Sequence, residues 1–119
     1  MTNVENCPPR RGAVAVLHDA PPVWVVTPSG DVDAHNVAPL IRALECAMRD
    51  EKAAVVDCSN IGFADSSFLN ALLQARQYIP VHLAEVPLQT SRLLELTHTV
   101  DLFHLHPDVA SALARFNDA

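Results

Sequence analysis

The 119-residue sequence is poor in glycine and in basic residues. Its three glycines are too few to build the glycine-rich loops that cradle phosphates in nucleotide-binding proteins. Eight Lys and Arg residues against 14 Asp and Glu residues give a net charge of -6, so nucleic acid is a poor partner and a basic protein surface fits better. No apolar run approaches the roughly 20 residues that a membrane-spanning helix needs, so we expect no membrane span.

Cysteine is also scarce: Cys7, Cys46 and Cys58 are odd in number and form no CxxC pair. We interpret them as buried free thiols in a reducing compartment. The N-terminus lacks the apolar core of a secretion signal, and we expect a cytoplasmic protein. Residues 1–11 are predicted to be a flexible lead-in and residues 12–119 a single domain.

Short apolar stretches alternate with segments of helical periodicity along the chain. Strands are expected at residues 13–17, 23–26, 53–56, 79–84 and 102–105, with turns at 19–22 and 27–31. Helical patterns begin near residues 34, 66, 87 and 107. The residues from Ala53 to Val56 are continuously apolar, which predicts a strand buried on both faces. This order indicates an α/β fold in which helices pack on a sheet.

The junction after this buried strand carries the most informative residues. A polar turn leads to Asp65-Ser66-Ser67 and then to a leucine-rich helical pattern. A hydroxyl at a helix start is exposed beside free backbone N–H groups, so Ser66 is the strongest candidate for modification, with a phosphate adding about -1.5 to -2 charges. From spacing alone, Asp65 or Ser66 is better explained as a helix cap. Asp33 is interpreted as a cap of the first helix.

The sequence offers no catalytic or cofactor-binding pattern. A nucleophile elbow of the G-x-S-x-G kind is absent, because Ala64 and Phe68 stand where the glycines around Ser66 would be. His104 and His106 alternate and are expected on one face of a strand, but a third metal ligand is lacking. We therefore expect no metal, no cofactor and no enzymatic activity, and we interpret Asp57 as a structural turn residue.

In order along the chain, four segments resemble those of the STAS domain, the anti-sigma factor antagonist family. Gly30-Asp31-Val32-Asp33 resembles its Gly-Glu-Leu-Asp turn, and residues 55–59 resemble its central strand. Residues 63–67, Phe-Ala-Asp-Ser-Ser, resemble its phosphorylation segment, and residues 93–97 resemble its Leu-Leu-x-x-Thr-Gly element. The similarity covers most of the chain from about Ala13 onward.

The resemblance implies a small mixed β-sheet with helices packed on one side. It implies that the protein binds an anti-sigma factor, usually a serine kinase, and so frees a sigma factor. It also implies that the kinase phosphorylates Ser66 to break the complex. The residues that it places at the partner-binding surface are Asp33, Asp65, Ser67, Phe68 and Asn70.

Three positions depart from the family pattern. The family has glycine where this chain has Phe68 and Asn70, and His98 replaces the later glycine. Phe68 has three interpretations: facing outward and altering kinase docking, filling the core, or anchoring a different partner. Phe68 and Asn70 favour an alternative function, a non-switching STAS module that serves as a scaffold or as part of a transport assembly.

Overall fold

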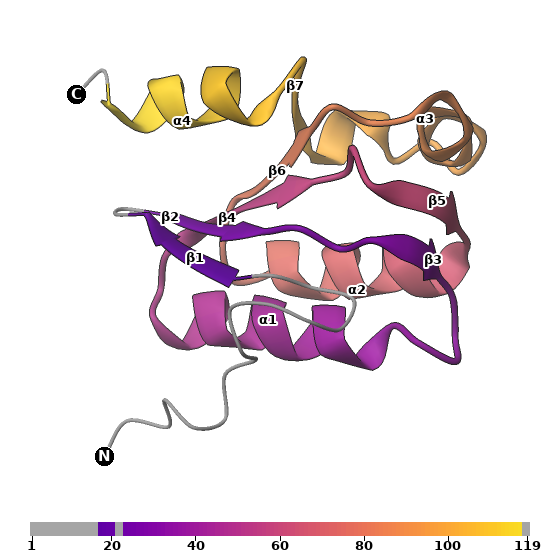
Figure 1. Ribbon diagram of the computed structural model, residues 1–119, viewed down its shortest axis with the longest axis horizontal. Helices are drawn as coiled ribbons and strands as arrows, with labels where there is room; N and C mark the ends of the chain where they lie inside the picture. The colour runs from indigo at the N-terminus through magenta and orange to yellow at the C-terminus, as the bar shows by residue number, and fades with distance from the viewer. Residues whose placement is uncertain (1–16, 21–22, 118–119) are drawn as a thin grey trace.

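The computed structural model describes residues 17–20 and 23–117 of the chain. Five strands form the main sheet in the order β1-β2-β4-β6-β7 (Figure 1). They are β1 (Leu17–Ala20), β2 (Val23–Val26), β4 (Ala53–Asp57), β6 (Val81–Ala84) and β7 (His104–His106). Strand β1 is antiparallel to β2, and the other neighbours are parallel, so the prediction of an α/β fold with a mixed sheet is confirmed. The predicted lead-in at residues 1–11 lies outside the described residues.

A second, two-stranded parallel sheet pairs β3 (Gly30–Val32) with β5 (Ile61–Ala64). Figure 1 shows these strands extending beyond the ends of β2 and β4. The sequence had predicted a turn at residues 27–31 and a polar turn before Asp65. The chain is irregular at residues 27–29 and turns at residues 59–60, so the polar turn is confirmed, and the first prediction is wrong only at Gly30 and Asp31. The sequence analysis missed β3 and β5, because each short strand is stabilised by pairing with the other rather than by a local apolar pattern.

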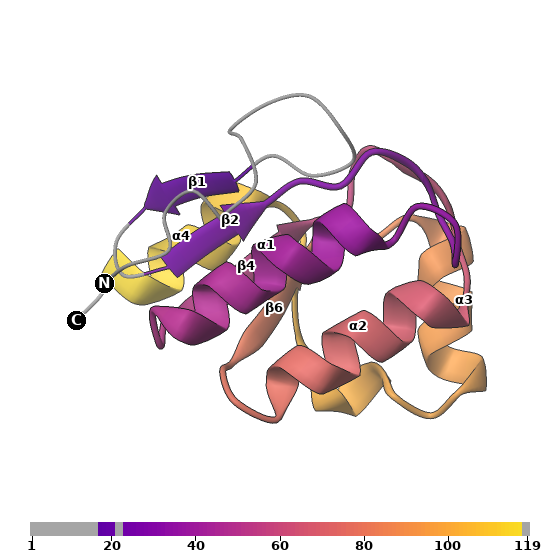
Figure 2. The ribbon, with the colours of Figure 1, turned by 90° about the horizontal axis from the view of Figure 1, so that it is seen from below.

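Four α-helices and one 3-10 turn complete the described chain: α1 (Ala38–Arg49), α2 (Ser66–Arg76), α3 (Leu88–Leu96), η2 (Val100–Leu102) and α4 (Val109–Asn117). Helices α1 and α2 lie side by side on one face of the main sheet (Figures 1 and 2). Helix α4 lies on the opposite face, so the expectation of helices on one side holds for α1 and α2 only. Each of these helices is too short to span a bilayer, and the described residues contain no candidate membrane span.

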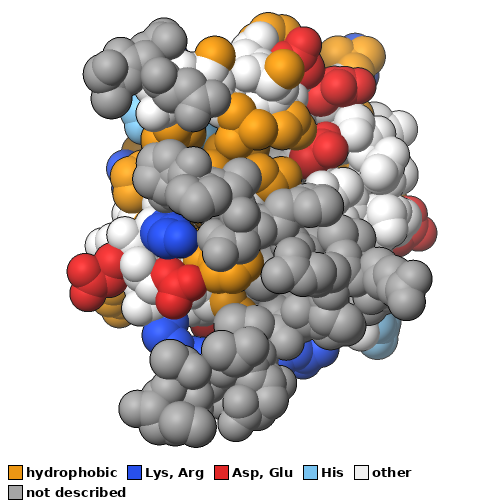
Figure 3. All heavy atoms as spheres, turned by 60° about the vertical axis from the view of Figure 1, so that its left-hand side comes forward, with side chains coloured by type: hydrophobic (Ala, Val, Ile, Leu, Met, Phe, Trp, Pro, Cys, Tyr) orange, Lys and Arg blue, Asp and Glu red, His pale blue; other side chains and the backbone are white. Residues whose placement is uncertain are grey.

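The strands supply apolar side chains to both faces because side chains alternate along a strand. On β4, Ala54 and Val56 join the larger core beneath α1 and α2, whereas Ala53 and Val55 join a smaller cluster beneath α4. The predicted burial of this strand on both faces is therefore confirmed. Hydrophobic side chains also remain visible on the side of the molecule that carries β1, β2 and the end of α4 (Figure 3).

Pro80 and His98 explain where strand β6 begins and where helix α3 ends. Strand β6 begins at Val81 rather than at Ile79, since Pro80 has no N–H to donate; its carbonyl accepts from Ala54 N at 3.0 Å. Helix α3 ends before His98, which adopts φ 57° at the position where the resemblance expects glycine. A residue with left-handed backbone angles after a helix turns the chain so that the next amide can bond to a carbonyl of the last helical turn. Here Thr99 N donates to Leu94 O at 2.9 Å.

The structure describes two cysteines, of which one is a free thiol and the other forms a disulfide. Cys58 is free and fully buried, and burial, followed by the negative charge of Asp57, raises the pKa of its thiol to about 12. Cys46 is buried but disulfide-bonded, so the prediction of a free thiol is wrong at that position. Cys7 lies outside the described residues.

Three histidines meet beneath α4. The ring of His82, only 5% exposed, stacks on His104 with ring centroids 4.4 Å apart, and its Nδ1 lies 2.9 Å from Nε2 of His106. Phe116 of α4 contacts the same ring edge-on at 5.0 Å. His104 and His106 therefore share a face of β7, as predicted. Burial and then the neighbouring His104, His106 and Arg115 lower the pKa of His82 to about 4.

This environment predicts a loss of stability in mild acid. The unfolded chain takes a proton on His82 near pH 6.5, whereas the folded chain resists protonation down to about pH 4. Stability from the neutral ring is thus complete above pH 6.5 and declines as the pH falls toward 4. We expect the free energy of unfolding, measured in urea, to fall from pH 7 to pH 5 in the wild type and to change less in His82→Asn.

Substitution of the exposed His35 by Asn is the matched control. It should retain the wild-type slope of stability against pH. If the stability of His82→Asn depends on pH as steeply as that of the wild type, protonation of His82 is not the cause of the loss of stability in acid.

Candidate functional site

The candidate site begins where β5 passes into α2. Asp65 is the N-cap of α2, and its Oδ1 accepts a hydrogen bond from Ser67 N at 2.8 Å. This satisfies one of the amides that a helix start leaves unpaired, and it confirms the prediction that Asp65 or Ser66 caps this helix. Ser66 is the first residue of α2 and is exposed. Within the described chain its hydroxyl makes no hydrogen bond, so the hydroxyl is open to solvent and to an enzyme.

The short parallel sheet brings a second carboxylate to this junction. Val32 pairs with Ala64, and Asp65 N donates to Val32 O at 3.3 Å. Asp33 and Asp65 therefore follow the ends of two neighbouring parallel strands. The Gly30–Asp33 segment thus lies beside the start of α2.

Asp33 does not cap α1, so that prediction is wrong. Its Oδ1 accepts from His35 N at 2.9 Å, and its own N–H donates to Asn36 Oδ1 at 2.7 Å. These bonds stabilise a turn, which delays the start of α1 from the expected residue 34 to Ala38. The N-cap of α1 is Val37, which offers no side-chain acceptor. Asp33 is half-buried and orders the loop beside the site.

Two phenylalanines near the site have opposite environments. Phe68 is fully buried in the core, so the prediction that its side chain contacts a partner is wrong. It points inward because it falls on the face of α2 that also buries Leu69 and Leu72. Phe63 on β5 is 49% exposed, three residues before Ser66. The sequence analysis missed Phe63 as a candidate contact residue, since an aromatic residue in an apolar stretch gives no signal of its exposure.

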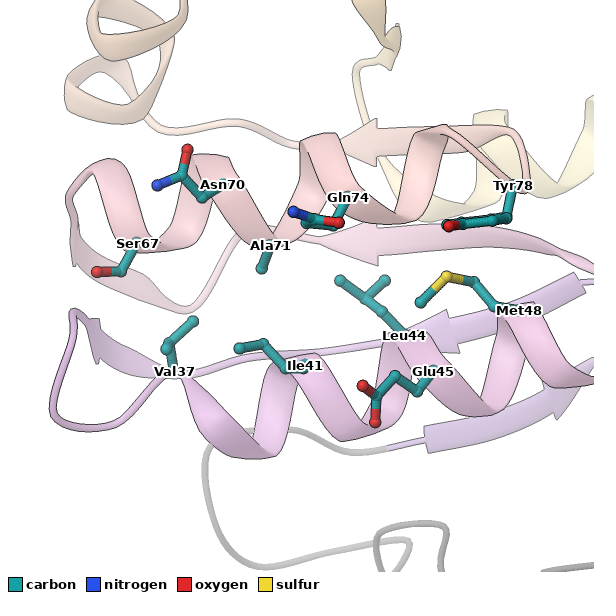
Figure 4. A pocket seen from close by; sticks show the side chains of 10 residues that line it. All are labelled: Val37, Ile41, Leu44, Glu45, Met48, Ser67, Asn70, Ala71, Gln74 and Tyr78. Atoms are coloured by element: carbon teal, nitrogen blue, oxygen red, sulfur yellow. The ribbon is translucent and has the colours of Figure 1, made fainter.

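Ser67 and Asn70 lie at a groove between α1 and α2, which has a volume of about 540 Å³. Its lining residues are Ile41, Leu44, Glu45 and Met48 from α1 with its N-cap Val37, and Ser67, Asn70, Ala71 and Gln74 from α2 with Tyr78 from the turn that follows it. In Figure 4, Val37, Ile41 and Leu44 point from α1 toward α2, and Ala71 points back toward α1. Glu45 and Asn70 point away from this apolar floor, to the outer rims of the groove. The site therefore continues from Ser66 into an amphipathic groove.

The turn at the end of β4 is structural. Asp57 Oδ1 accepts from Ser59 N at 3.1 Å and from Ser59 Oγ at 2.7 Å, as expected for a turn residue. Across residues 17–20 and 23–117, no group of three or more His, Cys, Asp or Glu side chains is arranged to hold a metal ion. The chemistry that the site offers is thus an exposed hydroxyl beside carboxylates, next to an apolar groove.

Comparison with known proteins defines the class to which this fold and site belong. The family model of the STAS domain matches residues 15–112, and the chain belongs to this family. No curated protein matches the sequence significantly.

Solved structures give the same fold. An anti-sigma factor antagonist from Mycobacterium paratuberculosis is 26% identical with a TM-score of 0.79, over 87% of this chain and 93% of that one. The anti-sigma factor antagonist SpoIIAA in its unphosphorylated form is 13% identical with a TM-score of 0.75, over 88% and 97%. The Bacillus cell fate determinant SpoIIAA in its phosphorylated form is 14% identical with a TM-score of 0.69, over 86% and 98%. The two SpoIIAA structures are similar in fold alone.

The two phenylalanines provide a matched test of the site's packing. Phe68→Ala should lower the free energy of unfolding by about 3–5 kcal/mol, because it leaves a cavity in the core. Phe63→Ala should cost about 1 kcal/mol or less, since half of that side chain is already in water. Urea denaturation at pH 7 measures both values. Equal losses in the two variants would contradict the burial difference.

Proposed function

We propose that this STAS domain is an anti-sigma factor antagonist, which binds an anti-sigma factor of the serine kinase type and so releases a sigma factor. The fold shared with the Mycobacterium paratuberculosis antagonist supports this proposal. So does the chain's net charge of -6, which suits a basic partner surface. The protein would act without catalysis of its own, as a cytoplasmic regulator of transcription.

The switch that we propose is phosphorylation of Ser66. The observation that carries it is the exposed hydroxyl of Ser66 at the first position of α2, free of hydrogen bonds within the described residues. A phosphate would be held by the amides and the positive dipole end of the helix. It would add about -1.5 to -2 charges and a bulky group beside Asp33 and Asp65, and this would disturb an interface that is fitted to the neutral hydroxyl.

The contact surface would include Asp33, Asp65, Ser67 and Asn70, with Phe63 as an exposed aromatic anchor. Phe68 contributes through the core, where it holds α2 in place. Aromatic side chains dominate many protein interfaces, because each buries a large apolar area at little cost in side-chain entropy.

Substitution of Ser66 tests the switch. With an anti-sigma serine kinase from the same organism and ATP, the wild type should gain one phosphate, read by intact mass, and should then release the kinase. Ser66→Ala should gain none and bind constitutively. Ser66→Asp should bind at least about tenfold more weakly, because a permanent charge stands at the interface.

Ser59→Ala is the matched control, because Ser59 is also exposed on a turn near the end of a strand. It should be phosphorylated like the wild type. If Ser66→Ala still acquires a phosphate, Ser66 is not the switch residue. If protein isolated from cells carries no phosphate and co-purifies in a larger assembly by native mass spectrometry, the alternative of a non-switching scaffold module is correct.

A further inference from the structure

We propose that the groove between α1 and α2 is a second contact surface for the partner that binds at Ser66. Its occupant is an amphipathic helix of that partner, carrying a Lys or Arg residue beside Glu45. This inference rests on the proposed function, because it assigns the partner a longer contact than the phosphorylation site alone.

The shape of the groove favours a helix as the occupant. It is lined from Val37, the N-cap of α1, to Met48, eleven residues further along, which corresponds to about 16 Å or three helical turns. Val37, Ile41, Leu44 and Ala71 form an apolar floor (Figure 4). Both walls are helices with internally bonded backbones, so a partner strand has no edge to extend. An amphipathic helix instead inserts apolar residues at i, i+3, i+4 and i+7.

The charge at the rim of the groove favours a basic residue on the partner's helix. Among the residues that the structure describes, Glu45 is the only charged one that lines the groove, and it is exposed. Among the described residues its carboxylate has no ion-pair partner. Arg42 and Arg49 stand three and four residues away on α1, but neither lines the groove. A cation placed at Glu45 is therefore favoured, and an acidic residue there is repelled.

The groove is continuous with the candidate switch. Ser67 lines its end, directly after Ser66 at the start of α2, whereas Tyr78, 72% exposed, lines the other end. A helix that fills the groove thus ends beside Ser66. A phosphate on Ser66 would then act on an interface that extends along α2, which explains how one charged group displaces a whole partner.

Binding to the anti-sigma serine kinase that phosphorylates the wild type tests this surface, with the dissociation constant measured by calorimetry. Ile41→Asp and Glu45→Arg should each weaken binding about tenfold, the first by placing a charge on the apolar floor and the second by reversing the rim charge. The matched controls are Leu96→Asp and Glu95→Arg on α3, which make the same changes at exposed positions outside the groove. Both controls should change binding less than about twofold.

A charge-reversal variant of the kinase completes the test: one Lys or Arg→Glu change on its docking helix should restore binding to Glu45→Arg. If the groove variants bind like their controls while Ser66→Asp is impaired, the groove proposal is overturned and the proposed function stands. If Ile41→Asp abolishes only self-association in sedimentation, the occupant is a second copy of this chain, and the proposal is also overturned. If the kinase neither binds nor phosphorylates the wild type, the proposed function fails and the groove inference falls with it.

Discussion

The parallel pairing of β3 with β5 is the constraint on which the candidate site depends. It aligns the ends of two strands that lie more than thirty residues apart, and the hydrogen bond from Asp65 N to Val32 O joins them directly. One strand end then turns through the Asp33 loop, and the other enters α2 through the Asp65 cap. Because Asp65 takes the capping role, the next residue, Ser66, is left with an unengaged hydroxyl.

The two faces of the main sheet have separate roles. One face carries α1 and α2, which together form both the larger core and the groove that continues from Ser66. The other carries α4 over the smaller apolar cluster and the three stacked histidines. Since these histidines lie outside the groove and away from the proposed phosphorylation site, we assign them to the stability of the fold rather than to partner binding.

The residues near Ser66 show what sequence reasoning can and cannot establish about a site. The Asp-Ser-Ser junction was found from the change of periodicity, and its Asp65 cap follows from local chemistry that operates within three residues. Asp33 was misassigned as a helix cap because an aspartate before a helical pattern can cap the helix or stabilise a turn, and only the structure shows that its carboxylate accepts from His35 N in a turn. Phe63 and Phe68 are chemically identical, and only packing decides that one is exposed and the other buried.

The α/β class, the strand buried on both faces, the N-terminal cap of α2 and the exposed position of Ser66 follow from the sequence itself. Each depends on patterns or bonds local to one segment, such as the unbroken apolar run of β4 or the carboxylate that precedes two serines. The β3-β5 sheet, the placement of α4 on the opposite face and the α1–α2 groove were decided only by the tertiary structure. Each of them depends on segments far apart in the chain, whose pairing is set by burial and by hydrogen bonds between them.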